Sequence, residues 1–146
     1  MLTPGQRDAL DTLGWTRVPG VIAPRACDAL VDAAHQLLAV AEASGAWPAP
    51  RADGPDVVNL PRAVRGHPAL DAWLRSGAVG ALARAALDAR RVRLLQDAVL
   101  HKPAGCAGVV PWHCDHTYVG YLRPARVVSV RVALTPSTPE SGCLEV

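Results

Sequence analysis

The sequence predicts an α+β protein in which helices come first and strands follow. Up to about residue 90, apolar residues recur with the i, i+3, i+4, i+7 spacing of amphipathic helices. From residue 91 onward they alternate with polar residues, which is typical of strands with one covered face. Because the two patterns are segregated along the chain, antiparallel strands joined by loops are favoured over a parallel α/β sheet.

Two helices are expected before residue 46. The first has Thr3 as its N-cap, Pro4 at its first helical position and Gly14 as its stop. The second begins at Pro24 and ends at Gly45. Its apolar stripe comprises Cys27, Leu30, Val31, Ala34, Leu37, Leu38 and Ala41, and His35 lies off it on the polar face.

The middle of the chain is expected to be a long loop followed by more helix. Residues 45–68 carry five prolines and several glycines, with a short strand expected at residues 56–60. Such a loop is either a functional lid or irregular structure, and the sequence supports both interpretations equally. Helical spacing resumes over residues 68–90, where Gly77 is expected to divide two helices.

Strands are predicted over residues 91–103, 125–136 and 142–146. A sheet begun by three strands and cut off at the third is incomplete, so we expect the sequence to be a fragment of a longer protein. The chain length suits a single domain, residues 1–146, that is helical over residues 1–90 and β-rich over residues 91–146.

Composition narrows the function classes. The net charge of +2 gives no drive toward nucleic acid. The start of the chain lacks the pattern of a signal peptide, and no apolar run is long enough to span a membrane. We therefore expect a cytoplasmic protein whose four cysteines are thiols, with no nucleic-acid or membrane partner.

The stretch "PWHCDHTY" holds the strongest candidate site. If its backbone is extended, His113 and Asp115 point the same way and Cys114 points the other way. An imidazole nitrogen beside a carboxylate oxygen can clamp a divalent metal, and a 2-His-1-carboxylate triad would need one further His. The motif is common by chance, so its context must support it; the alternative is a polar turn capped by Asp115.

The context resembles the phytanoyl-CoA dioxygenase family. "LTPGQRDALDTLGWTRVPGVIAPRACDAL" is similar to its N-terminal opening, and "LLQDAVLHKPAG", "VVPWHCDHTYVG" and "ARVVSVRVALTPSTPESGCLEV" are similar to its central part. The resemblance implies a double-stranded β-helix, a cupin-like jelly roll, carrying Fe(II) and using 2-oxoglutarate as cosubstrate. It also implies a dioxygenase that hydroxylates a small-molecule substrate and decarboxylates 2-oxoglutarate to succinate.

The resemblance places His113 and Asp115 at the first two iron ligands. The third ligand, a later His, and an Arg that binds 2-oxoglutarate have no counterpart before Val146, so the chain resembles a C-terminally truncated member. Arg131 stands where the family often has Trp, and its planar fork suits a carboxylate. Retention of Asp115 implies hydroxylation and not halogenation.

Other residues are candidates for the cosubstrate or substrate pocket. Gln96 lies on the preceding strand, and Thr117 and Tyr118 follow the motif, while Trp112 is expected to pack beneath the site. Strand alternation puts Arg131 on the face opposite the valines, directed either to solvent or into the barrel mouth.

Three other interpretations stay open. The chain could be a cupin-like module that binds a metal or small acid without turnover, or an inactive fragment lacking the third iron ligand. A structural zinc site is the third, with its ligands drawn from His113, Cys114, His116 and either Cys106 or Cys143.

Overall fold

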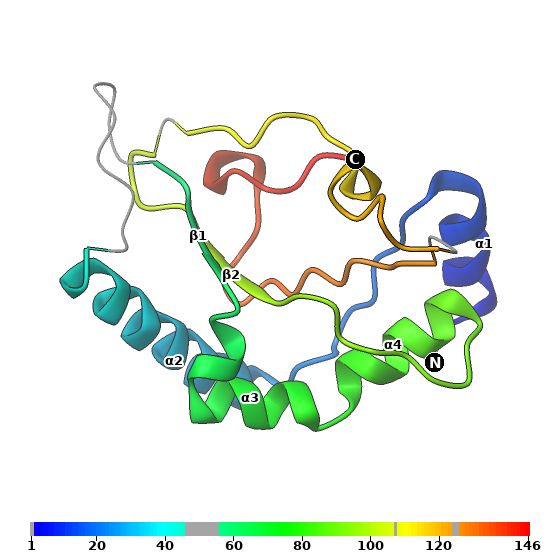
Figure 1. Ribbon diagram of the computed structural model, residues 1–146, viewed down its shortest axis with the longest axis horizontal. Coiled ribbons are helices and arrows are strands. Elements are labelled where there is room, and N and C mark those ends of the chain that lie inside the picture. The colour runs from blue at the N-terminus through cyan, green and yellow to red at the C-terminus, as the bar shows by residue number, and fades with distance from the viewer. Residues whose placement is uncertain (1, 46–55, 107, 124–125) are drawn as a thin grey trace.

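The computed structural model in Figure 1 describes residues 2–45, 56–106, 108–123 and 126–146. Its helices are α1 (Pro4–Leu13), α2 (Pro24–Ala43), α3 (Pro68–Arg75) and α4 (Ala78–Leu87). Strands β1 (Val58–Pro61) and β2 (Ala98–His101) form an antiparallel sheet. Short 3-10 helices occur at Val64–Gly66, Asp115–Tyr118 and Pro139–Ser141. The predicted α+β class is confirmed in this mixture of helices and a small antiparallel sheet.

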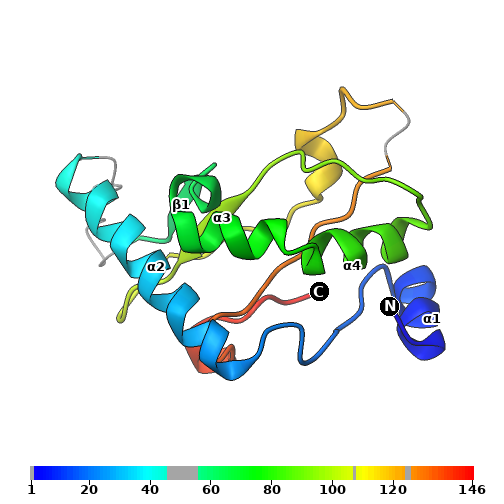
Figure 2. The same cartoon turned by 90° about the horizontal axis from the view of Figure 1, so that it is seen from below.

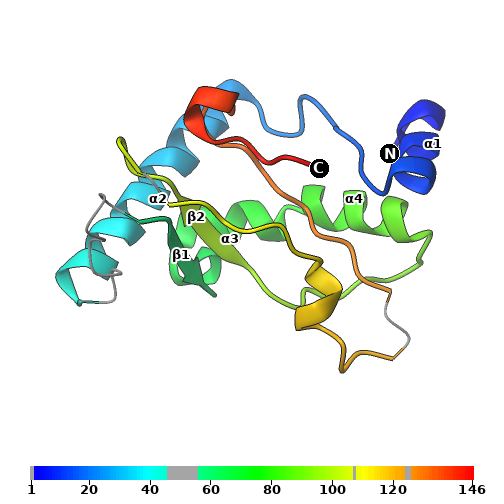
Figure 3. The ribbon, with the colours of Figure 1, turned by 90° about the horizontal axis from the view of Figure 1, so that it is seen from above.

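The elements form two layers. Seen from below, α2 and α3 lie in front of β1 (Figure 2), and seen from above, the sheet and the extended second half of the chain lie over these helices (Figure 3). Helix α1 lies apart, beside α4, where Arg7 Nη1 donates to the carbonyl of Ala86 at 2.8 Å. The helical layer thus supports the segments that carry the candidate site.

Helix boundaries follow local signals that the sequence predicts. Thr3 caps α1 by accepting from the backbone N–H of Gln6, whose side chain reaches back to the N–H of Thr3. Gly14 ends α1 at a φ of +81°, a conformation in which a Cβ would be strained. Gly77, at a φ of +91°, separates α3 from α4 as expected.

The core lies between α2 and α3. Leu30 and Ala33 of α2 pack with Leu70 of α3, and the partly buried apolar residues around them are Ile22, Leu37, Val64, Trp73, Val99 and Leu134. Most of the predicted stripe of α2 is buried or half-buried, and His35 is exposed as expected. Val99 and Leu134 show that the second half of the chain contributes to the same core.

The sheet is smaller than the sequence predicts. The short strand expected at residues 56–60 is confirmed as β1, which pairs Val58 with His101 and Pro61 with Ala98. β1 ends at Pro61, after which the chain turns at Arg62 with a φ of +60°, and β2 covers only residues 98–101 of the predicted strand 91–103. Of the long loop expected over residues 45–68, residues 46–55 lie outside the described part of the chain, and residues 56–68 contain β1 and the 3-10 helix Val64–Gly66.

Two predicted strands are absent from the described residues. Residues 126–136 and 142–146 are assigned no strand, because none of the described backbone pairs with them as a ladder. The alternation itself holds: Val128, Val130 and Val132 are half-buried, whereas Ser129 and Arg131 are exposed. The incomplete jelly roll stays a prediction.

Candidate functional site

The loop that leads from β2 to the site is fixed where it passes β1. Gly108 is buried against the side chain of Asp56 and the backbone of Val57, and a Cβ on Gly108 would overlap the Asp56 carboxylate. The thiol of Cys106 lies 3.8 Å from the Gly108 carbonyl. This close backbone approach sets the direction in which the chain enters the segment 111–118.

The structure brings the side chains of His113 and Asp115 together. His113 Nε2 lies 3.4 Å from Asp115 Oδ1. Between them Cys114 is extended, with φ of −110° and ψ of 123°, so the two side chains share one side of the backbone. The extended stretch ends there, because Asp115 begins the 3-10 helix Asp115–Tyr118.

The imidazole of His113 is oriented by a backbone carbonyl. Its Nδ1 lies 2.7 Å from the oxygen of Pro111. A carbonyl can only accept, so Nδ1 carries the hydrogen and Nε2 of the neutral ring keeps a lone pair facing Asp115. This is the tautomer that a metal ligand bound through Nε2 requires.

The carboxylate of Asp115 is held from its far side. The hydroxyl of Ser129 donates to Asp115 Oδ2, which leaves Oδ1 facing His113. Ser129 comes from the extended segment 126–136, so this contact joins two segments that are 14 residues apart. Neither Ser129 nor the Pro111 carbonyl is among the site residues predicted from the sequence. The signal for Ser129 is its place on the same alternating face as Arg131.

We call the paired side chains of His113 and Asp115 the clamp. The other predicted site residues differ in whether they contact it. The Tyr118 ring contacts the His113 ring edge-on, with centroids 5.6 Å apart and an interplanar angle of 69°. Thr117 contributes a backbone bond to the Cys114 carbonyl, and its side chain is exposed. Gln96 and Arg131 are exposed, and neither has a side-chain hydrogen bond or ion pair among the described residues.

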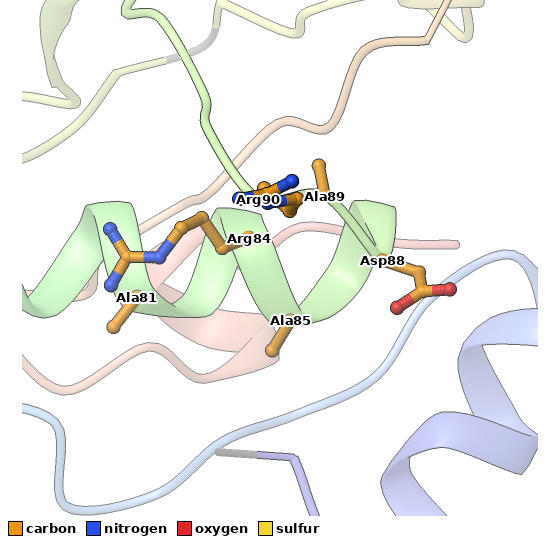
Figure 4. A pocket seen from close by; sticks show the side chains of 6 residues that line it. All are labelled: Ala81, Arg84, Ala85, Asp88, Ala89 and Arg90. Carbon is orange, nitrogen blue, oxygen red and sulfur yellow. The ribbon is translucent and has the colours of Figure 1, made fainter.

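Two features differ from the expected pocket. Trp112 is 77% exposed, so the expectation that it packs beneath the site is wrong; none of the described chain covers it. A shallow depression lies instead at the end of α4, where Ala81, Arg84, Ala85, Asp88, Ala89 and Arg90 surround it (Figure 4). None of the predicted site residues lines that depression.

The donor set fits a divalent metal but is incomplete. Two ligands at about 2.1 Å from one ion and at right angles lie about 3 Å apart, close to the observed Nε2–Oδ1 separation. Imidazole with carboxylate is a donor set for non-haem Fe(II). Within the described ranges, no three His, Cys, Asp or Glu residues are grouped to hold an ion. The zinc alternative therefore has no ligand cluster there.

The comparisons with known proteins agree with the motif. A family model described as Phytanoyl-CoA dioxygenase (PhyH) matches residues 10–146. A search of curated proteins found no match, and a search of solved structures found none either. In the part of the chain that the structure describes, no helix has the length and apolarity needed to cross a membrane.

Proposed function

Because this chain belongs to the phytanoyl-CoA dioxygenase family, we propose that His113 and Asp115 hold Fe(II) for 2-oxoglutarate-dependent hydroxylation of a small molecule. Members of the family are dioxygenases that generally use Fe(II) and 2-oxoglutarate. The substrate is a small molecule, the protein has no nucleic-acid or membrane partner, and it acts in the cytoplasm. The oxidative chemistry is supplied by the metal and the 2-oxo acid when they are bound.

The observation that carries this proposal is the paired orientation of the two ligands. His113 Nε2 and Asp115 Oδ1 face each other at 3.4 Å, while Pro111 and Ser129 occupy their other polar atoms. The Pro111 carbonyl accepts from Nδ1–H whether the ring is neutral or protonated, and in the neutral ring this bond leaves Nε2 without a hydrogen. The hydrogen bond that directs the Nε2 lone pair toward the carboxylate is what a metal site needs.

The remaining candidate residues have roles in binding. Tyr118 contacts one side of the His113 ring and limits its rotation. Arg131 shares the exposed face of Ser129, which meets Asp115, and this supports a role for its guanidinium in binding a carboxylate of the cosubstrate or substrate. Gln96 and Thr117 offer exposed polar groups to the same ligands. Within the described ranges, no third His, Cys, Asp or Glu is grouped with His113 and Asp115.

The reaction balances with one atom of dioxygen in succinate and the other in the hydroxyl group of the substrate, while the carboxyl group lost from 2-oxoglutarate leaves as carbon dioxide. Dioxygen, 2-oxoglutarate and a substrate C–H group give succinate, carbon dioxide and the hydroxylated substrate. Succinate is formed once in each turnover, and it can be followed without the substrate when an added two-electron reductant takes up the second oxygen atom as water.

The test is succinate formation by the protein with Fe(II) and 2-oxoglutarate. His113→Ala should abolish succinate, because one of two described ligands is lost. His116→Ala is the matched control, since this exposed neighbour has no side-chain contact to the clamp. Equal succinate formation by wild type and His113→Ala would contradict the proposal.

A second function is favoured by the two-ligand count alone. A module that binds a metal or small acid without turnover also needs only the described His113–Asp115 clamp. Metal binding that depends on both residues, with no succinate under any condition, would support this module over the oxygenase.

A further inference from the structure

We propose that Ser129 is a positioning residue that holds Asp115 as a metal ligand through one oxygen, an inference that rests on the proposed function. The hydroxyl of Ser129 donates to Asp115 Oδ2. An ionised carboxylate only accepts, so this bond occupies the oxygen that faces away from His113. The other oxygen, Oδ1, is thereby left for the ion.

Each ligand of the clamp is restrained from behind by one partner. The Pro111 carbonyl holds His113 through Nδ1, and the Ser129 hydroxyl holds Asp115 through Oδ2. The two partners differ in kind: the carbonyl belongs to the backbone two residues away, whereas the hydroxyl comes from a separate segment. Only the second restraint is removed by changing a side chain.

Ser129 matters because little else restrains the carboxylate. The Asp115 side chain is 58% exposed, so water competes for its oxygens and its rotation is open. Ser129, by contrast, is directed by its neighbours, since Val128 and Val130 turn toward the protein and force the residue between them outward. The packing of the valines thus fixes the direction of Ser129, and the hydrogen bond from Ser129 in turn orients Asp115.

A carboxylate freed from this bond would either turn away or bind the ion through both oxygens. Either change disturbs the pairing with His113 Nε2. Removing an outer partner of a metal ligand typically weakens metal affinity by about 10- to 100-fold. The hydroxyl, and not the size of the side chain, should account for this loss.

The test compares Ser129→Thr with Ser129→Val, which have nearly the same shape and differ in the hydroxyl. Co(II) serves as a spectroscopic probe for Fe(II), with its dissociation constant taken from visible absorption and from calorimetric titration of the whole chain. Ser129→Thr should bind Co(II) within about threefold of wild type, and Ser129→Val about 10- to 100-fold more weakly. Ser137→Ala is the control, because this exposed serine makes no side-chain hydrogen bond to any described residue, and it should leave the affinity unchanged.

Melting temperatures of all variants separate a loss of fold from a loss of orientation. Equal Co(II) affinity of the Thr and Val variants would overturn the role of Ser129, while loss of binding in His113→Ala in the same experiment would leave the proposed metal site standing. A wild-type chain that binds no Co(II) would overturn both. Weakening by Thr and Val alike would assign the effect to packing and also overturn the role of the hydroxyl.

Discussion

Asp97 is a buried carboxylate that stands directly before β2 and binds the 3-10 helix Val64–Gly66. Asp97→Ala should therefore lower the free energy of unfolding substantially. Its side chain is 5% exposed. Oδ2 accepts from the backbone N–H of Val64 at 3.0 Å, and Oδ1 accepts from Arg65 Nε at 2.8 Å. The Asp97 carbonyl also accepts from the N–H of Arg62, a backbone bond that the substitution leaves in place.

The two side-chain contacts contribute unequally to the expected loss. The Val64 N–H, half-buried, would lose its acceptor, which costs about 1–3 kcal/mol. Arg65 is 46% exposed, so its guanidinium regains water and its share is at most about 1 kcal/mol. Together these effects predict a destabilisation of about 1–4 kcal/mol.

The assay is urea unfolding followed by circular dichroism, with Asp71→Ala as the matched control. Asp71 also pairs with an arginine, Arg75, at 2.7 Å, but this pair lies on the surface of α3 at i, i+4. The second oxygen of Asp71, Oδ1, is buried and has no hydrogen-bond partner among the described residues, so its removal breaks no further bond. The control should therefore cost about 0.5 kcal/mol or less. Equal losses in the two variants, or a loss below about 1 kcal/mol for Asp97→Ala, would refute the assignment of Asp97 as a buried anchor.

Three further predictions concern the elements around the site. Burial, and then the nearby His35, lower the pKa of His101 from 6.5, so the unfolded chain takes up the proton first and the free energy of unfolding should fall as the pH drops below that value. Urea unfolding at several pH values should show that this free energy depends less on pH in His101→Gln than in the wild type. Val58 is 0% exposed, so Val58→Ala should cost about 2 kcal/mol in the same assay, and a loss near zero would mean that β1 is not buried. Gly108→Ala should lower the melting temperature, because the added Cβ would meet the Asp56 carboxylate and the Val57 backbone. Gly80→Ala inside α4 adds a Cβ that meets no atom within 4 Å, so it should raise the melting temperature and stabilise the protein by up to about 1 kcal/mol.

The helices could be predicted from the sequence because their signals are local. Pro4, Gly14 and Gly77 act through their own backbone conformations, and the structure places the boundaries where these residues stand. The α2 stripe is equally local, since i, i+4 neighbours share a face whatever surrounds the helix.

The strands could be predicted only in part because a strand needs a partner. Alternation over residues 126–136 correctly gives which side chains are covered, but it does not say which backbone would pair with them. The predicted burial of Trp112 was wrong for a related reason, because burial depends on which distant segment lies over the side chain and a local pattern does not contain this.

The candidate site shows the same division. The closeness of His113 and Asp115 follows from their spacing in an extended segment, so the sequence was sufficient to predict it. The contact between Ser129 and Asp115 joins segments that are distant in the sequence. Alternation indicated the face on which Ser129 lies, but only the fold shows what that face meets.

The most direct test of the shared metal site is a double-mutant cycle of Fe(II) affinity, measured anaerobically by calorimetry. The variants are His113→Ala, Asp115→Ala and the double substitution. If both side chains bind one ion, each single variant should lose nearly all the affinity and the double variant should lose little more. Independent, additive losses, or wild-type affinity no different from the double variant, would contradict a site in which Nε2 of His113 and Oδ1 of Asp115 bind the same ion.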